Sequence, residues 1–162
     1  GNARIFNDAH VCCDARVFGN AHVSGNVFGE AQVYDVARVY RDARVGGEAR
    51  VCGEAKVCGG AEVYGGAQVC GGAQVCGGAE VSGDARIRAT NDYIVFKNCW
   101  SSGRRFTWTR SNNMWRVGCF YGTGDELIAK AYKDSEKSGR EYERVVRYVE
   151  SILADEQKGN EE

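Results

Sequence analysis

Histidine is scarce in this chain, and its scarcity limits the chemistry that the protein can perform. The 162 residues include two histidines, His10 and His22, and neither lies in residues 89–162. A nucleophilic cysteine needs a base to lower its pKa, and that base is typically a histidine. Cys119 lacks such a partner in its own half of the chain, so we interpret it as a core cysteine and predict no catalytic residue.

The chain also lacks a long apolar run and an excess of either charge. No stretch approaches the roughly 20 apolar residues that span a bilayer, and no secretory signal is visible, so we expect no membrane partner. Lysine and arginine number 21, aspartate and glutamate 22, and the formal net charge is −1. This balance argues against non-specific binding of the whole chain to nucleic acid or to acidic membranes.

A six-residue repeat, Ala-x-Val-x-Gly-x, fills the first half of the chain. Fourteen copies of Ala-x-Val or Ala-x-Ile run from Ala3 to Ile87, and a period this strict indicates a solenoid. Within a copy, Ala and Val point to the same side of an extended strand, and turn-forming residues follow them. One hexad is short: Ala21 and Ala31 are ten residues apart where two periods need twelve, so two residues are missing around 25–28.

The repeat resembles that of the hexapeptide-repeat proteins, whose left-handed parallel β-helix uses three hexads for each triangular coil. The resemblance implies a mainly β fold with a β-helix of about five coils over residues 1–88. Many of these proteins are acyltransferases that use an active-site histidine and loops that leave the coil. Here no insertion exceeds a hexad, and His10 and His22 fall on different sides of the coil. We therefore predict that the chain is not an enzyme, and an acyltransferase is the enzymatic alternative.

Eight cysteines raise the question of disulfides or of a metal site. Four of them share the slot after valine, which elsewhere holds tyrosine, and Cys52 stacks over Cys70 as Cys58 does over Cys76. Each stacked pair lies within disulfide range. The two pairs occupy different sides of the coil and do not converge on a metal. We expect free thiols in a reducing cytoplasm, and neither a metal nor a cofactor.

The residues between Ala and Val face solvent and form three columns. A basic column could hold a phosphate-bearing partner, but we interpret all three as solvated faces that separate strand edges. The columns are Arg4, His22, Arg38, Lys56, Gln74; His10, Arg44, Glu62, Glu80; and Arg16, Gln32, Arg50, Gln68, Arg86.

The composition changes after Arg88, and residues 89–158 predict a small α+β domain that consists of an antiparallel β-meander and two helices. Strands are expected at 93–97, at 104–110 and at 114–120, with the apolar residues of the second strand on a covered face and its threonines on a wet face. Residues 159–162 are predicted to be a disordered tail.

Thr123 and Glu126 match a capping box that opens the first predicted helix. That helix is expected to run to about Glu136 and to stop near Ser138–Gly139. The second helix carries an apolar stripe, which is usually the face that covers a sheet. Its members are Tyr142, Val145, Val146, Val149, Ile152 and Leu153.

The tail has its own resemblance. Residues 116–126 and 139–142 look like the tail of the phage and prophage hexapeptide-repeat proteins, which carry a Cys-Phe-x-Gly-Thr-x-Asp-Glu segment and a tyrosine in the final helix. Gly118 precedes Cys119 where these relatives often have Cys-Gly-Cys. The resemblance implies a viral protein that acts in the cytoplasm of a bacterial host, with a host defence protein as the suggested target.

Basic and aromatic residues gather within thirteen positions of the second half. Arginine pairs with phosphate and tryptophan stacks on bases, and both are frequent anchors of protein interfaces. The alternative is that the tryptophans belong to the covered face and the arginines to the wet face. We predict that a partner or ligand is bound by Arg104, Arg105, Trp108, Arg110, Trp115 and Arg116.

These observations predict a non-enzymatic binding protein, in which the coil is a scaffold for the small α+β recognition domain. The open ends of a β-helix expose unpaired backbone groups, so we expect a homo-oligomer, most simply a dimer or trimer through the coil. The expected partner is a host protein. A sponge that sequesters a nucleotide signal between subunits is the alternative binding function, and a structural spacer is a third reading.

Overall fold

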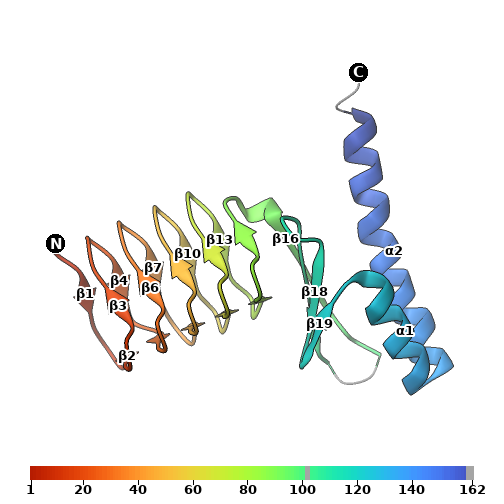
Figure 1. The fold of residues 1–162 in the computed structure, drawn as a ribbon, viewed down its shortest axis with the longest axis horizontal. Coiled ribbons are helices and arrows are strands. Elements are labelled where there is room, and N and C mark those ends of the chain that lie inside the picture. Colours follow the sequence, from red (N-terminus) through yellow and green to blue (C-terminus); the bar gives the residue numbers. More distant parts are fainter. Residues whose placement is uncertain (101–102, 160–162) are drawn as a thin grey trace. The chain divides into compact units, whose positions relative to one another are not determined.

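The computed structural model describes residues 1–100 and 103–159. Its first part is a parallel β-helix in which fifteen two-residue strands, three to a coil, form three five-stranded sheets (Figure 1). A four-stranded sheet and two helices follow in the sequence. The predicted fold class, a β-helix of about five coils followed by a small α+β region, is confirmed.

Every third strand joins the same sheet, so each coil contributes one strand to each of three faces. The first face contains β1 (Arg4–Ile5), β4 (His22–Val23), β7 (Arg38–Val39), β10 (Lys56–Val57) and β13 (Gln74–Val75). The second face contains β2 (His10–Val11), β5 (Asn26–Val27), β8 (Arg44–Val45), β11 (Glu62–Val63) and β14 (Glu80–Val81). The third face contains β3 (Arg16–Val17), β6 (Gln32–Val33), β9 (Arg50–Val51), β12 (Gln68–Val69) and β15 (Arg86–Ile87).

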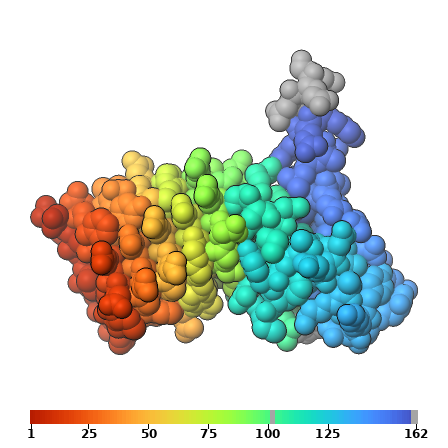
Figure 2. Space-filling model, in the orientation of Figure 1, coloured from red at the N-terminus to blue at the C-terminus, as the bar shows by residue number. Residues whose placement is uncertain are grey.

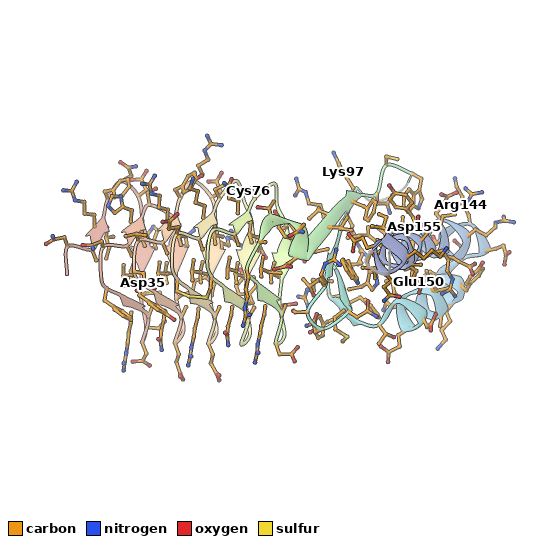
Figure 3. All side chains as sticks on the ribbon, turned by 90° about the horizontal axis from the view of Figure 1, so that it is seen from above. Asp35, Cys76, Lys97, Arg144, Glu150 and Asp155 are labelled. Atoms are coloured by element: carbon orange, nitrogen blue, oxygen red, sulfur yellow. A yellow bond between two sulfur atoms is a disulfide. The ribbon has the colours of Figure 1, made fainter. Side chains whose placement is uncertain are left out.

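The interior of the coil holds alanine and valine almost alone. From Ala21 to Ile87 these inward side chains are fully buried, because neighbouring coils cover them and Tyr93 and Val95 pack against the same core. Figure 2 shows the successive coils packed against one another, from red to yellow-green. The longer side chains project outward from the three faces (Figure 3).

The short hexad turns out to be a complete strand that lacks the turn before it. Gly25 is buried and stacks on Ala43, so it occupies the interior slot that alanine fills elsewhere. A Cβ added to Gly25 would lie 2.8 Å from the carbonyl oxygen of Ala43, which explains the glycine. The fifteenth repeat is therefore Gly25-Asn26-Val27, and the two missing residues are the turn pair that Arg41 and Asp42 supply one coil later.

Hydrogen bonds join each coil to the coils on both sides of it, in the pattern of a parallel ladder. The backbone N–H of Arg38 donates to the carbonyl oxygen of Ala55 at 2.8 Å, and that of Tyr40 donates to Val57 at 3.0 Å. The same offset recurs along each face, so every coil directs one set of N–H groups toward the coil that follows it. The last coil therefore presents N–H groups that have no further coil to receive them.

Side chains of the following segment receive these N–H groups. The Tyr93 hydroxyl accepts from Cys76 at 3.3 Å, Thr107 Oγ1 accepts from Glu80 at 2.9 Å, and Ser111 Oγ accepts from Arg86 at 2.7 Å. Asp92 Oδ2 also accepts from the two backbone N–H groups of residues 88 and 89. We call Tyr93, Asp92, Thr107 and Ser111 the cap residues. Buried N–H groups without partners are costly, so these bonds close the end of the β-helix.

The cap residues belong to a short helical turn, to the first two strands of the second sheet and to the turn that follows them. These elements are η1 (Thr90–Asp92), β16 (Tyr93–Lys97) and β17 (Arg105–Thr109), and β18 (Met114–Val117) follows. All of them fall in one compact unit with the coil, Gly1–Cys119. The predicted domain boundary at residue 88 thus marks the end of the repeat, and the meander packs with the coil beyond it.

Two expectations for this meander need correction. Thr107 and Thr109 are buried and do not lie on a wet face, because the coil end covers the side of β17 that alternation assigns to solvent. The third strand ends at Val117, because Gly118 turns the chain with a φ of 57°. A fourth strand, β19 (Phe120–Gly122), follows, and the strand order is β16-β17-β18-β19.

The second compact unit, Phe120–Glu162, contains helices α1 (Gly124–Asp134) and α2 (Glu136–Gly159). The capping box is confirmed: Thr123 Oγ1 accepts from the Glu126 N–H at 3.3 Å, and Glu126 Oε2 accepts from the Thr123 N–H at 2.8 Å. The Thr123 N–H and then the Thr123 hydroxyl, which both donate to Glu126 Oε2, hold the pKa of Glu126 below its usual value. Leu127, Ile128 and Ala131 of α1 are buried, as are Val146 and Val149 of α2.

The break between the helices lies earlier than predicted. Ser135 is extended, and its hydroxyl accepts the N–H of Ser138 at 3.1 Å, so a serine cap begins α2 there. Gly139 lies inside α2 and is buried against the ring of Tyr132. Helix α2 also continues to Gly159, so the predicted disordered tail is wrong for that residue. The rest of the predicted tail, 160–162, lies outside the described residues.

The stacking of the cysteines is confirmed, but the expectation of free thiols is wrong for four of them. The structure contains two disulfides, Cys52–Cys70 and Cys58–Cys76, with Cα–Cα distances of 4.6 and 4.8 Å. Cys76 is labelled in Figure 3. Each disulfide joins adjacent coils, because the rung spacing of a parallel sheet matches disulfide geometry. The remaining four cysteines are free and exposed.

Removal of one disulfide should measure how much that bond adds to the stability of the coil. The bond between Cys58 and Cys76 closes a loop with a sequence separation of 18. The double substitution Cys58→Ser, Cys76→Ser should lower the free energy of unfolding by about 3 kcal/mol under non-reducing conditions. Denaturant unfolding measures this, and in excess reductant the difference from wild type should disappear. Equal unfolding midpoints without reductant would show that the bond is absent in solution.

The cap predicts a second stability effect. Thr107→Val removes the oxygen that accepts the Glu80 N–H and keeps the side-chain shape, so it should cost about 1–3 kcal/mol. Thr107→Ser, which retains the acceptor, is the matched control and should lose less. Thermal and denaturant unfolding compare the variants. If valine and serine were equally tolerated, the hydrogen bond to the coil would not contribute to stability.

Candidate functional site

The six residues predicted to bind a partner lie on β17, on β18 and beside them. The structure brings them onto one hairpin but divides them by exposure. Arg104 and Arg105 are exposed, whereas Arg110 and Arg116 are partly buried. The tryptophans are almost completely buried, with exposed fractions of 1% for Trp108 and 2% for Trp115.

The two tryptophans form part of a core. They lie directly opposite each other in the antiparallel register of β17 and β18. The indole Nε1 of Trp108 donates to Asn113 Oδ1 at 2.8 Å, which satisfies its polar atom. Neither ring presents a face to a ligand, so this arrangement does not form the stacking platform that a single-stranded nucleic acid requires.

The arginines make contacts inside the first unit, and the Arg105 side chain lies against Gly78 of the last coil. Arg116 forms an ion pair with Glu80 at 3.6 Å, and Arg110 lies over the Trp108 ring at 5.6 Å. Burial raises the pKa of Glu80, and the charge of Glu62 acts in the same direction while Arg116 opposes it. Arg110 and Arg116 therefore attach the hairpin to its surroundings. Recognition by the six residues remains a prediction, and Arg104 and Arg105 are its exposed members.

The residues considered for catalysis do not assemble with partners. Cys119 is exposed, which corrects its interpretation as a core cysteine, and it follows the turn residue Gly118. His10 and His22 lie on strands of different faces, as their spacing predicted. Within residues 1–100 and 103–159, no group of three or more His, Cys, Asp or Glu side chains is placed to hold a metal ion. Over the same residues, no helix has the length and apolarity needed to cross a bilayer.

The coil also has a surface recess that the sequence did not predict. The volume of this recess is about 360 Å³. It lies at the corner where the short hexad lacks its turn pair, next to the first face. The signal was present in the sequence as two separate features, the missing residues and the column Phe6–Ser24–Tyr40. The lining residues are Phe6, His22, Ser24, Arg38, Tyr40 and Lys56.

A comparison of this chain with protein-family models, with curated proteins and with solved structures finds no match. The residues and the geometry described above therefore carry the functional argument.

Proposed function

We propose that this chain is a non-enzymatic binding protein, in which a stiff β-helix holds an exposed basic segment at its end for recognition by a protein partner. The observation that carries the proposal is the set of cap hydrogen bonds, which attach β16 and β17 and the turn after them directly to the last coil. Any side chain on these strands is thereby held in a fixed position relative to the faces of the coil.

The exposed side chains on this platform are basic. Arg104 precedes β17 and Arg105 begins it, and both residues are exposed beside the four buried residues of that strand. Arginine is enriched in the energetically dominant positions of protein interfaces. A rigid backbone lowers the entropy that the arginines lose on binding. An acidic surface on the partner is the complement that this segment favours.

The tail segment supports the host assignment. Its resemblance to phage and prophage hexapeptide-repeat proteins is the basis for proposing a viral protein whose partner is a bacterial host protein, with a defence protein as the suggested class. We propose the host cytoplasm as its location. Two disulfides are unusual there, because cytosolic thiols are kept reduced. Reduction in that setting would open the two disulfides, and we propose that the backbone hydrogen bonds between coils hold the coil in the reduced form.

A pull-down from bacterial host lysate tests the proposed function. The double substitution Arg104→Glu, Arg105→Glu reverses the exposed basic segment, and the matched control Arg50→Glu, Arg86→Glu makes the same charge change on the third face. Quantitative mass spectrometry should show one enriched host protein that the first variant loses at least about tenfold and the control retains. Equal capture by all three proteins, or by none, would contradict the proposal.

The oligomeric state provides an independent test. Ile5 is 53% exposed although valine is fully buried in the same slot from the second coil on, and Phe18 is 46% exposed. Association through these apolar side chains of the coil would bury them. Light scattering at micromolar concentration should report a dimer or trimer, and a monomeric mass would contradict the oligomer.

A further inference from the structure

One column of side chains on the coil contains an aromatic stack with a ring missing. Phe6, Ser24 and Tyr40 follow β1, β4 and β7, so they occupy the same corner in three successive coils. Their backbone N–H groups each donate to the valine of the next coil at 2.8–3.0 Å, which fixes this register. Ser24 thus stands between two aromatic residues and leaves the space above its hydroxyl open.

The neighbouring column shows the arrangement when no ring is missing. Phe18 and Tyr34 follow β3 and β6 on adjacent coils, and their rings are parallel within 2° with centroids 5.0 Å apart. Adjacent rungs therefore place two rings at stacking distance without rearrangement. Phe6 and Tyr40 are two rungs apart, roughly 9.6 Å, so a planar ring between them would lie about 4.8 Å from each. That separation falls within the range of favourable aromatic pairs.

The short hexad makes this space accessible. Between Ser24 and Gly25 the chain lacks the two turn residues that project from the same corner one coil later, as Arg41 and Asp42. The corner is therefore recessed in this coil alone. The His22 ring stands edge-on to the Phe6 ring, with centroids 6.3 Å apart, and closes one side of the recess.

A ridge of cations borders the recess on the first face. Arg38 and Lys56 are direct neighbours in the register of β7 and β10. Among the described residues neither forms an ion pair, in contrast to Arg44 on the second face, which lies 3.7 Å from Glu62. Two adjacent cations without acidic partners attract an anion, and arginine can hold a phosphate with two parallel hydrogen bonds.

The distribution of carboxylates decides on which side of the ridge an anion would lie. None of the described residues that line the recess is acidic. The hollow on the other flank of Arg38 and Lys56 includes Glu54, which would repel an anion. An anion on the ridge is therefore favoured on the side where the aromatic gap lies.

We propose that this recess, which we call the notch, binds a nucleotide. The base stacks between Phe6 and Tyr40 above Ser24, and the phosphate lies on Arg38 and Lys56. A volume of about 360 Å³ is at the small end of ligand pockets, which suits a mononucleotide. Stacking accepts any base, because every base has a π-face, so the notch selects for a ring joined to a phosphate. This function goes beyond the proposed partner binding, because it uses the coil, which that function treats as a scaffold.

Calorimetry and NMR titration of the full chain test the notch. AMP, GMP, CMP and UMP are the probes, and adenosine and inorganic phosphate are the two half-ligands. At least one mononucleotide should bind, and each half-ligand should bind at least about tenfold more weakly, because it makes one of the two sets of contacts. Absence of binding by all four mononucleotides at 1 mM (about 4 kcal/mol of binding free energy) would overturn the proposal. Inorganic phosphate binding as tightly as the best nucleotide would also overturn it.

Two substitutions separate the ring contact from the charge contact. Ser24→Phe supplies the missing ring from the chain itself and should abolish nucleotide binding, and Phe18 stacked on Tyr34 shows that the coil accepts such a pair. Arg38→Gln should weaken binding at least about tenfold. The control Arg50→Gln removes an arginine from the third face and should leave the affinity unchanged.

The variants give clear outcomes. If Ser24→Phe proves unstable by circular dichroism, Arg38→Gln against Arg50→Gln decides the question alone. Equal weakening by Arg38→Gln and Arg50→Gln would show that the nucleotide responds to net charge only, and would overturn the notch. Loss of nucleotide binding with retained capture of a host protein would separate this site from the proposed function.

Discussion

The hydrogen-bond ladder between coils is the constraint on which the rest of the structure depends. Each coil directs a set of N–H groups toward the next coil, so the coil stack cannot end without acceptors for that set. A hydroxyl or carboxylate can accept such a bond, and an apolar side chain cannot. This requirement accounts for the tyrosine, threonine, serine and aspartate that the following segment presents to the last coil. It also accounts for the burial of β17 on both sides.

The same regularity makes the short hexad informative. In a solenoid with identical rungs, every side chain has an equivalent neighbour about 4.8 Å away, and the corners are continuous ridges. Loss of one turn pair leaves the strand ladder intact, because Gly25 takes the interior slot of alanine. The missing turn pair changes only the outer surface of the coil, where one corner is recessed beside Arg38 and Lys56. A local deletion thus adds a recess at one corner of the coil.

The coil itself could be predicted from the sequence, because Ala-x-Val repeats determine the interior side. The resemblance to hexapeptide-repeat proteins implied the three faces and, through them, the cysteine columns. Gly25 was missed as an interior residue, since the pattern was counted on alanine. The burial of Thr107 and the position of the helix break at Ser135 were also missed. Alternation along a strand shows that two sides differ, but it cannot show that a coil end covers the second side. Similarly, Gly139 suggested a later break between the helices, but Ser135 begins α2 because its hydroxyl accepts the N–H of Ser138. The tryptophans illustrate the same limit, because composition alone does not distinguish a binding platform from a core.

Hydrogen–deuterium exchange of individual amides tests the central claim most directly. If the cap residues close the ladder, the amides of Cys76, Glu80 and Arg86 should exchange as slowly as amides inside the coil, such as those of Arg38 and Tyr40. Exchange of these three amides at the rate of an unstructured chain, with the interior amides still protected, would contradict the account. It would show that the last coil is open and that the meander is not attached to it.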